Sequence, residues 1–298
     1  MEDKRSMSRR QYMKTYRKTS FLGEIIGSFT RNKLAVLGFF VFLVILIGAL
    51  AAESIMSYQQ VISINPVERL QGPSAQHFFG TDEMGRDIFG RILHGARISL
   101  RIGVTSVLLS LIAGAILGSV AGYFGGRVDM VVMRIMDVFI CLPNFLLAVA
   151  IVAAFGTSET NMLIAISISQ VPACARIVRS AILSVRDQEY VEAARALGVR
   201  VPSIILKDIL MNCFGPIIVH CTLQVAFAIT TIATLSFLGL GIAAPAPEWG
   251  CMLSSARTYM REYPHLVIFP GMAIFFTVFS FNLLGDGLRD ALDPRLRQ

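Results

Sequence analysis

The sequence predicts an all-α membrane protein that crosses the bilayer six times. Of its 298 residues, 54% are hydrophobic and only 16% are charged, whereas about 25% of a soluble domain is charged. The chain also contains six apolar runs near the length of about 20 residues that a spanning helix needs. These runs are Leu34–Ala52, Ile102–Tyr123, Met130–Phe155, Met162–Val178, Phe214–Leu240 and Leu266–Leu284.

Two of the runs contain proline. Pro143 interrupts the third run and Pro172 lies in the fourth. A proline inside a helix removes a backbone hydrogen bond and clashes with the preceding turn, so a kink is expected in each. Pro143 and the following Asn144 leave two interpretations open. They loosen the third span for gating of the transport path, or they kink it around a neighbouring helix.

The distribution of charge predicts the orientation. The net charge is +7, and 20 of the 27 Lys and Arg residues lie in the tails and loops on one side of the six spans or in the adjoining ends of the spans, with 7 on the other side. This asymmetry follows the positive-inside rule, so both termini are expected in the cytoplasm. It also argues against nucleic-acid binding as the reason for the positive charge. The small residues after the first run, "GALAAES", resemble a signal-peptide cleavage site, but the long basic tail favours an uncleaved anchor.

This orientation divides the chain into five parts. They are a basic cytoplasmic tail (1–33), the first span (34–52), a periplasmic segment (53–96), a core of five spans (97–285) and a cytoplasmic tail (286–298). The core includes one large cytoplasmic loop (183–208) and one periplasmic loop (241–265).

The sequence gives no sign of catalytic or metal chemistry. The five cysteines form no CxxC pair, the four histidines are scattered, and neither HExxH nor GxSxG occurs. No GxxxxGK[ST] motif is present either, so any ATP is expected to bind another chain. We therefore expect no enzyme activity, no metal ligands and no cofactor in this chain.

One charged stretch, "EYVEAARALG" (189–198), stands out in the large cytoplasmic loop. On a helix, Ala193, Ala194 and Leu197 form a compact surface, and acidic residues occupy the first turns, where negative charge is favoured. Gly198 suits the end of this helix and Pro202 the start of the next. The small surface indicates a docking site for another protein. The alternative is an amphipathic helix lying flat on the membrane.

"EYVEAARALG", followed by "IILKDILMN" (204–212), resembles the EAA loop of the membrane subunits of bacterial ABC importers. Family members usually have a proline where this chain has Met211. Four further stretches resemble the dipeptide, oligopeptide and nickel branch, most closely its second (C-type) permease subunit. They are "FGTDEMGRDIFGRILHGARISLRIG" (79–103), "GYFGGRVDMVVMRIMDVFICLPNFLLA" (122–148), "SFLGLGIAAPAPEWGCML" (236–253) and "FPGMAIFFTVFSFNLLGDGLRDALDPRLR" (269–297).

The resemblance implies a type I ABC importer permease fold in the bacterial inner membrane. It also implies several partners: a homologous permease subunit, two cytoplasmic subunits that bind ATP and Mg, and a periplasmic or lipid-anchored solute-binding protein. The cargo implied is a dipeptide or small peptide, with oligopeptides, glutathione and nickel complexes as alternatives. The residues expected to couple this chain to the ATPases are Glu189, Tyr190, Glu192, Ala193, Ala194, Leu197 and Gly198.

Polar residues in the spans are candidates for the translocation path, because polar groups inside a bilayer are costly. Asn144 is one candidate, and the others share one face of the fifth run: His220, Gln224, Thr231 and Thr234. That face either lines the path or bonds to neighbouring helices. Arg134 and Asp137, three residues apart, are expected to form an ion pair, and Asp129 to be an ordinary loop charge.

The outward segments contain candidate contacts for the solute-binding protein. They are Asp82, Arg86, Asp87, Glu248 and Trp249. The alternative for Trp249 is an anchor at the membrane interface.

Two rival functions fit less well. An ion-coupled secondary transporter typically shows internal repeats, and no clear repeat is found. An intramembrane enzyme needs a nucleophile with a base or closely spaced metal ligands, and the sequence has neither.

Overall fold

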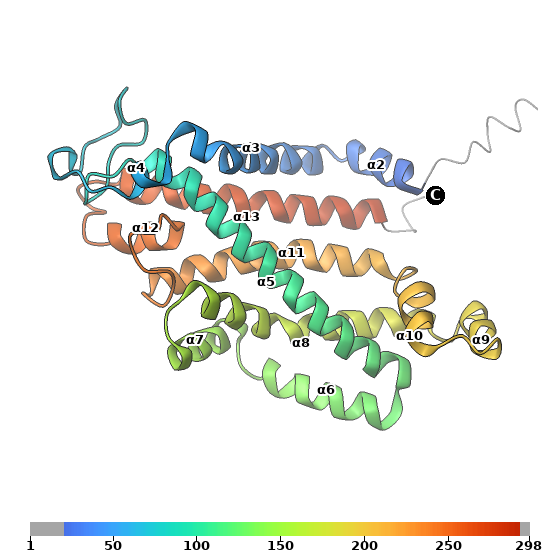
Figure 1. Ribbon diagram of the computed structural model, residues 1–298. Coiled ribbons are helices and arrows are strands. Elements are labelled where there is room, and N and C mark those ends of the chain that lie inside the picture. The colour runs from blue at the N-terminus through green and yellow to red at the C-terminus, as the bar shows by residue number, and fades with distance from the viewer. Residues whose placement is uncertain (1–20, 293–298) are drawn as a thin grey trace, which may run out of the picture.

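The computed structural model describes residues 21–292, and this part of the chain is helical throughout its regular structure (Figure 1). Five helices are each long and apolar enough to cross a membrane. They are α3 (Lys33–Ile55), α5 (Ile88–Phe124), α8 (Glu159–Val185), α11 (Phe214–Phe237) and α13 (His265–Leu292). They correspond to five of the six predicted spans. The predictions for residues 1–20 and 293–298 lie outside the described residues.

The third predicted span is broken. α6 (Gly126–Ile140) and α7 (Asn144–Phe155) meet at an angle of 81°, and together they form one broken span or a re-entrant loop. Pro143 takes the position just before α7, where its missing N–H costs nothing. The expected kink within one helix is therefore a full break between two helices, with Asn144 as the first residue of the second.

Several helices begin where their side chains can satisfy the first backbone N–H groups. The Asn32 side chain accepts hydrogen bonds from the backbone N–H groups of Leu34 and Ala35, which places the start of α3 directly after the basic tail. Asp87 accepts from the N–H of Gly90 and starts α5. As a result α5 begins 14 residues before the predicted span and includes the end of the outward segment.

Glycines bring α5 and α8 into close contact. Gly114, Gly118 and Gly122 follow one another at intervals of four along α5, so they lie on one face. A Cβ at Gly118 would lie 2.4 Å from the carbonyl oxygen of Ala175, and one at Gly114 would lie 2.7 Å from Cys174 Cβ. Small residues at this spacing let membrane helices approach backbone to backbone.

The short elements gather at the two ends of the bundle (Figure 1). We call one of them the α9 end. It contains α2 (Phe21–Arg31), the last turns of α13, and the loop helices α9 (Glu189–Ala196), α10 (Val201–Ser203) and η2 (Ile204–Ile209). The opposite, α12 end contains α4 (Tyr58–Ile62), η1 (Pro66–Glu68) and α12 (Trp249–Ala256).

Candidate functional site

The loop helix α9 projects from the bundle with most of its surface uncovered (Figure 1). Leu197, just past its end, is 83% exposed. Among the predicted coupling residues, Ala194 is half-buried and the other six are exposed: Glu189, Tyr190, Glu192, Ala193, Leu197 and Gly198. An exposed apolar side chain beside small residues is a surface that a protein partner can cover.

The opposite side of α9 is anchored to the bundle. Val191 is fully buried and packs in a cluster with residues of α8 and η2, among them Ile182, Ile204 and Ile209. This burial covers the apolar side of α9 with protein. An amphipathic helix lying on lipid would need that side for the membrane, so the structure favours the docking interpretation.

Two further contacts join the loop to the end of α5. The guanidinium of Arg195 lies over the ring of Tyr123, and Arg186 donates a hydrogen bond of 2.9 Å to the carbonyl oxygen of Gly122. Lysine and arginine side chains are favourable near a helix C-terminus, because they donate hydrogen bonds to its free carbonyl oxygens. The loop is therefore attached to both α8, from which it emerges, and α5.

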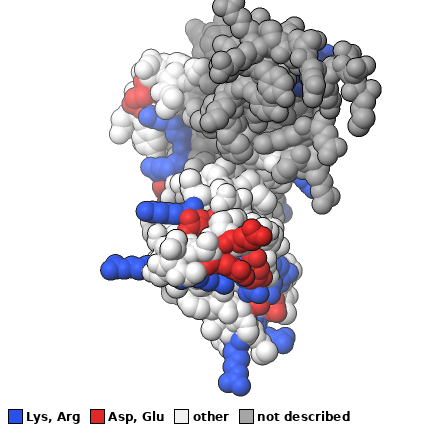
Figure 2. Space-filling view, turned by 90° about the vertical axis from the view of Figure 1, so that its right-hand side faces the viewer, with Lys and Arg blue, Asp and Glu red and all other residues white. Residues whose placement is uncertain are grey.

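The ends of the loop helices follow the predicted signals. Gly198 has a φ of +73°, the left-handed conformation that favours glycine after a helix. Pro202 lies in the first turn of α10. From there the chain continues through the π-helical turn η2 to Cys213, just before α11. Figure 2, viewed from this end of the molecule, shows acidic and basic side chains close together on the surface.

The outward-facing candidates are buried at the α12 end. Asp82 is 6% exposed, and its carboxylate accepts a hydrogen bond of 2.7 Å from Arg86 Nε and lies 3.4 Å from Arg91 Nε. Asp87, which caps α5, also bonds to the ring of His77 at 2.8 Å. These side chains fold the segment between α3 and α5 back onto the bundle.

Glu248 and Trp249 are also buried. The Glu248 carboxylate accepts hydrogen bonds of 2.8 Å from the N–H groups of Gly250 and Cys251 and caps α12. Burial raises the pKa of the Glu248 carboxyl, and the hydrogen bond from Gly250 partly opposes this. The Trp249 indole is 1% exposed and donates to the carbonyl oxygen of Ile92, so it is no interfacial anchor. Contact of these five side chains with a binding protein stays a prediction, and their burial means they would support such a surface rather than form it.

Comparison with known proteins identifies the family. Residues 114–298 match the family described as binding-protein-dependent transport system inner membrane component. Residues 20–73 match the N-terminal transmembrane domain of oligopeptide transport permease C. The chain belongs to this family of transport permeases.

Relatives of this permease cover nearly its whole length. It is 47% identical over 92% of its residues, and 90% of the relative, to a dipeptide transport system permease protein, DppC, of Alkalihalophilus pseudofirmus. It is 46% identical over 90% of its residues, and 89% of the relative, to a glutathione transport system permease protein, GsiD, of Pectobacterium atrosepticum.

A solved structure shows the same fold. A chain of the MetNI methionine ABC transporter in an inward-facing conformation matches with a TM-score of 0.56 at 16% identity. The match covers 68% of the permease and 97% of that chain. The expected type I importer permease fold is thus confirmed.

The polar residues predicted to share one face of α11 are half-buried or buried in the permease. His220 and Gln224 are half-buried, and Nε2 of His220 is buried with no hydrogen-bond partner among the described residues. Thr231 is 4% exposed, and the hydroxyls of Thr231 and Thr234 bond to carbonyls of their own helix. Like Asn144, which is half-buried, these residues stay predictions for the path.

The ion pairs that α6 makes in the permease differ from the one that was expected. Asp137 pairs with Arg176 of α8 at 3.0 Å, and not with Arg134 as predicted. Asp129 is no ordinary loop charge, because Arg179 of α8 holds both of its carboxylate oxygens, at 2.5 and 2.6 Å. Both pairs attach α6 to α8. Their partners lie 39 and 50 residues further along the chain, so local spacing could not find them.

Three features of functional interest were not predicted from the sequence. They are the glycine face of α5, the contact between Arg195 and Tyr123, and a charged cavity at the α12 end. Only the glycines leave a signal, their spacing of four. Within residues 21–292, no three His, Cys, Asp or Glu side chains are placed to hold a metal ion.

Proposed function

We propose that this permease is a membrane subunit of an ATP-driven importer that carries dipeptides or other small peptides into a bacterium. The single observation that carries the proposal is the state of α9, which is exposed on its docking side and anchored through the buried Val191 on the other. The relatives named for dipeptide and glutathione transport support peptide cargo.

In this proposal the α9 end faces the cytoplasm, in accord with the positive-inside rule. Two ATP-binding subunits dock on α9 and on the corresponding helix of a homologous permease subunit. The ATP and Mg bind these partners. A solute-binding protein delivers the cargo at the α12 end, and the permease itself makes and breaks no covalent bond.

Transmission of movement follows from the contacts of the loop. Closure of the ATPases on ATP displaces α9. Val191 passes the displacement to α8, and Arg195 and Arg186 pass it to the end of α5. Because ATP binds the closed state better, its binding shifts the permease toward the state that is open at the α12 end.

The docking test uses Leu197, whose exposed side chain the fold does not need. The complete importer is reconstituted in lipid vesicles with loaded binding protein, and ATP hydrolysis and uptake of a labelled dipeptide are measured. We expect Leu197→Asp to abolish stimulated hydrolysis and uptake, and the matched variant Leu197→Met to preserve both. Normal activity of an assembled Leu197→Asp complex contradicts docking at α9.

The cargo test uses the parent complex with its own binding protein. Uptake of a labelled dipeptide is measured with and without an excess of unlabelled glutathione, and uptake of labelled glutathione is measured in parallel. We expect dipeptide accumulation that glutathione competes with weakly. Accumulation of glutathione alone identifies the second candidate cargo, which the relative from Pectobacterium atrosepticum supports.

A further inference from the structure

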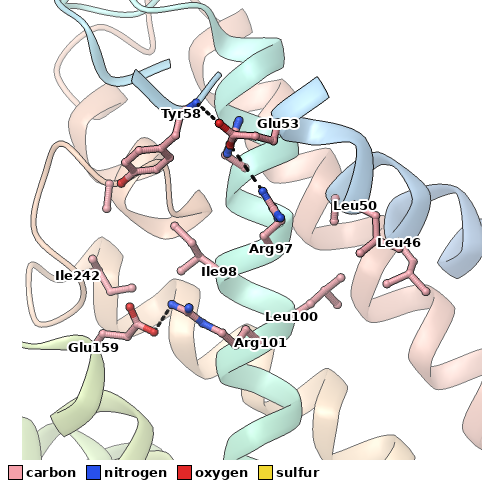
Figure 3. A pocket seen from close by; sticks show the side chains of 13 residues that line it. Leu46, Leu50, Glu53, Tyr58, Arg97, Ile98, Leu100, Arg101, Glu159 and Ile242 are labelled. Atoms are coloured by element: carbon pink, nitrogen blue, oxygen red, sulfur yellow. Dashed lines mark hydrogen bonds and ion pairs between the residues drawn. The ribbon is translucent and has the colours of Figure 1, made fainter. Parts of the chain in front are cut away.

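A cavity of about 640 Å³ lies at the α12 end between α3, α5, the start of α8 and the loop before α12. Figure 3 shows four charged side chains from three helices around it, Glu53 of α3, Arg97 and Arg101 of α5, and Glu159 of α8. Apolar side chains fill the wall between them: Leu46, Leu50, Ile98, Leu100 and Ile242. The volume is in the range of small-molecule binding sites.

The four charges form two ion pairs. Arg97 lies 3.7 Å from Glu53, and Arg101 is hydrogen-bonded to Glu159. Their side chains are between 41% and 62% exposed, with Arg101 the most exposed and Glu53, at 55%, next. Exposed pairs of this kind contribute little to stability, so a charged ligand can replace either partner at little cost.

The position of the charges also needs an explanation. Arg101 lies 13 residues after the start of α5, where the outward segment ends and the long apolar part of the helix begins. A charged side chain at the edge of an apolar helix typically faces water or a partner. Glu159 and Glu53 lie at the corresponding ends of α8 and α3, so the charges form one layer at the outer mouth of the bundle.

The spacing of the charges fits a small zwitterion. Each ion pair contains one arginine of α5, and because Arg97 and Arg101 are four residues apart, the two pairs are separated by about 6 Å along the helix axis. The two ends of an extended dipeptide are about 7 Å apart. One end carries an ammonium group and the other a carboxylate, which match the two signs of charge in the cavity, while the apolar wall suits the peptide side chains.

We propose that this cavity is a subsite that receives a dipeptide by its two charged ends, an inference that rests on the proposed function. Arg101 binds the peptide carboxylate in exchange for Glu159, and Glu53 binds the ammonium group in exchange for Arg97. The subsite is occupied after delivery at the α12 end and before passage through the bundle. The ion pairs keep the empty site neutral.

The test separates a ligand site from a simple link between α5 and α8. Arg101→Gln removes the guanidinium that would bind the carboxylate and also breaks the ion pair. Glu159→Gln breaks the same ion pair but leaves Arg101 free. Dipeptide uptake per ATP hydrolysed is measured for the complete importer in vesicles with saturating loaded binding protein, beside Arg101→Lys as the conservative variant.

We expect Arg101→Gln to lower uptake per ATP by about fivefold, because it removes the cation that binds the peptide carboxylate at an exposed site. Glu159→Gln should stay within about twofold of the parent and Arg101→Lys should retain most uptake. Equal losses in Arg101→Gln and Glu159→Gln overturn the proposal, and so does the absence of any loss. If Arg101→Gln fails to assemble, Glu53→Gln is compared with Arg97→Gln, because both variants break the same ion pair and only Glu53 binds the ammonium group.

Failure of the subsite and failure of the proposed function are separate results. A parent complex that accumulates no dipeptide refutes the proposed cargo, and the subsite with it, before any variant is compared. A parent that accumulates dipeptide, with variants that behave alike, refutes the subsite alone.

Discussion

The guanidinium carbon of Arg195 lies 4.8 Å from the centre of the Tyr123 ring, and its Nε donates a hydrogen bond of 3.3 Å to the Tyr123 hydroxyl. The two residues are 72 positions apart in the chain. This contact joins α9, the exposed docking helix, to the last turn of α5, whose other end forms the charged cavity.

Replacing Tyr123 tests this connection without altering the docking surface. Tyr123→Leu removes the aromatic ring, and a cation–π contact at an exposed site contributes about 0.5–1 kcal/mol. We expect dipeptide uptake per ATP hydrolysed to fall by about 2–5-fold. The control Tyr123→Phe keeps the ring and should remain near the parent. A loss of equal size in Tyr123→Phe would assign the effect to the hydroxyl instead.

Val191 is expected to hold α9 in place. Val191→Ala removes two fully buried methyl groups and should destabilise the loop locally by about 1–3 kcal/mol. The measurement is hydrogen exchange of the backbone amides of α9 in the purified complex. Leu197→Ala, at an exposed position, should change exchange little. Unchanged exchange in Val191→Ala would show that other contacts fix α9.

The glycine contact between α5 and α8 should tolerate no added carbon. The Cβ in Gly118→Ala would meet the Ala175 carbonyl oxygen, and overpacking of this kind costs about 1–3 kcal/mol. We expect a lower melting temperature in detergent. Gly271→Ala, in α13, is the matched control because its Cβ meets no atom within 4 Å, and it should leave the melting temperature unchanged or raise it. A Gly118→Ala variant as stable as Gly271→Ala would argue against close packing.

Glu248 should make stability depend on pH. Burial raises its pKa in the folded chain above the ordinary value of 4.5, so the folded state binds the proton more tightly than the unfolded state does. Its contribution to stability is therefore full below pH 4.5 and is lost as the pH rises through the folded pKa. The melting temperature of the parent should fall relative to that of Glu248→Gln as the pH increases from 4.5. A constant difference between the two proteins up to pH 8 would contradict this.

The sequence predicted the spans better than their contacts. Hydropathy alone located the long helices, because the bilayer sets their length and composition. The end of α9 followed from Gly198 and the start of α10 from Pro202, because the backbone preferences of glycine and proline act locally. The angle of 81° between α6 and α7 was not predictable, since proline permits a kink or a break and the packing around it decides.

In the candidate sites, too, local features were predictable from the sequence and contacts between distant residues were not. The helix from Glu189 and its exposure were predicted correctly, because its small and charged composition is visible in the chain, and the coupling role of its residues stays a prediction. Trp249 looked like an interfacial anchor, yet its indole bonds to Ile92, 157 residues away. Pairs such as Asp129 with Arg179 and Arg101 with Glu159 depend on which helices are neighbours, and one sequence does not determine that.

The absence of side chains along one face of α5 has a mechanical consequence. Since Gly114, Gly118 and Gly122 press three successive turns of α5 against α8, these helices can neither slide nor bend apart without losing contact over that whole length. α5 has 37 residues and is therefore about 55 Å long. If the pair tilts at the α9 end, it must therefore move as one rigid body, and Arg97 and Arg101 at the far end move with it.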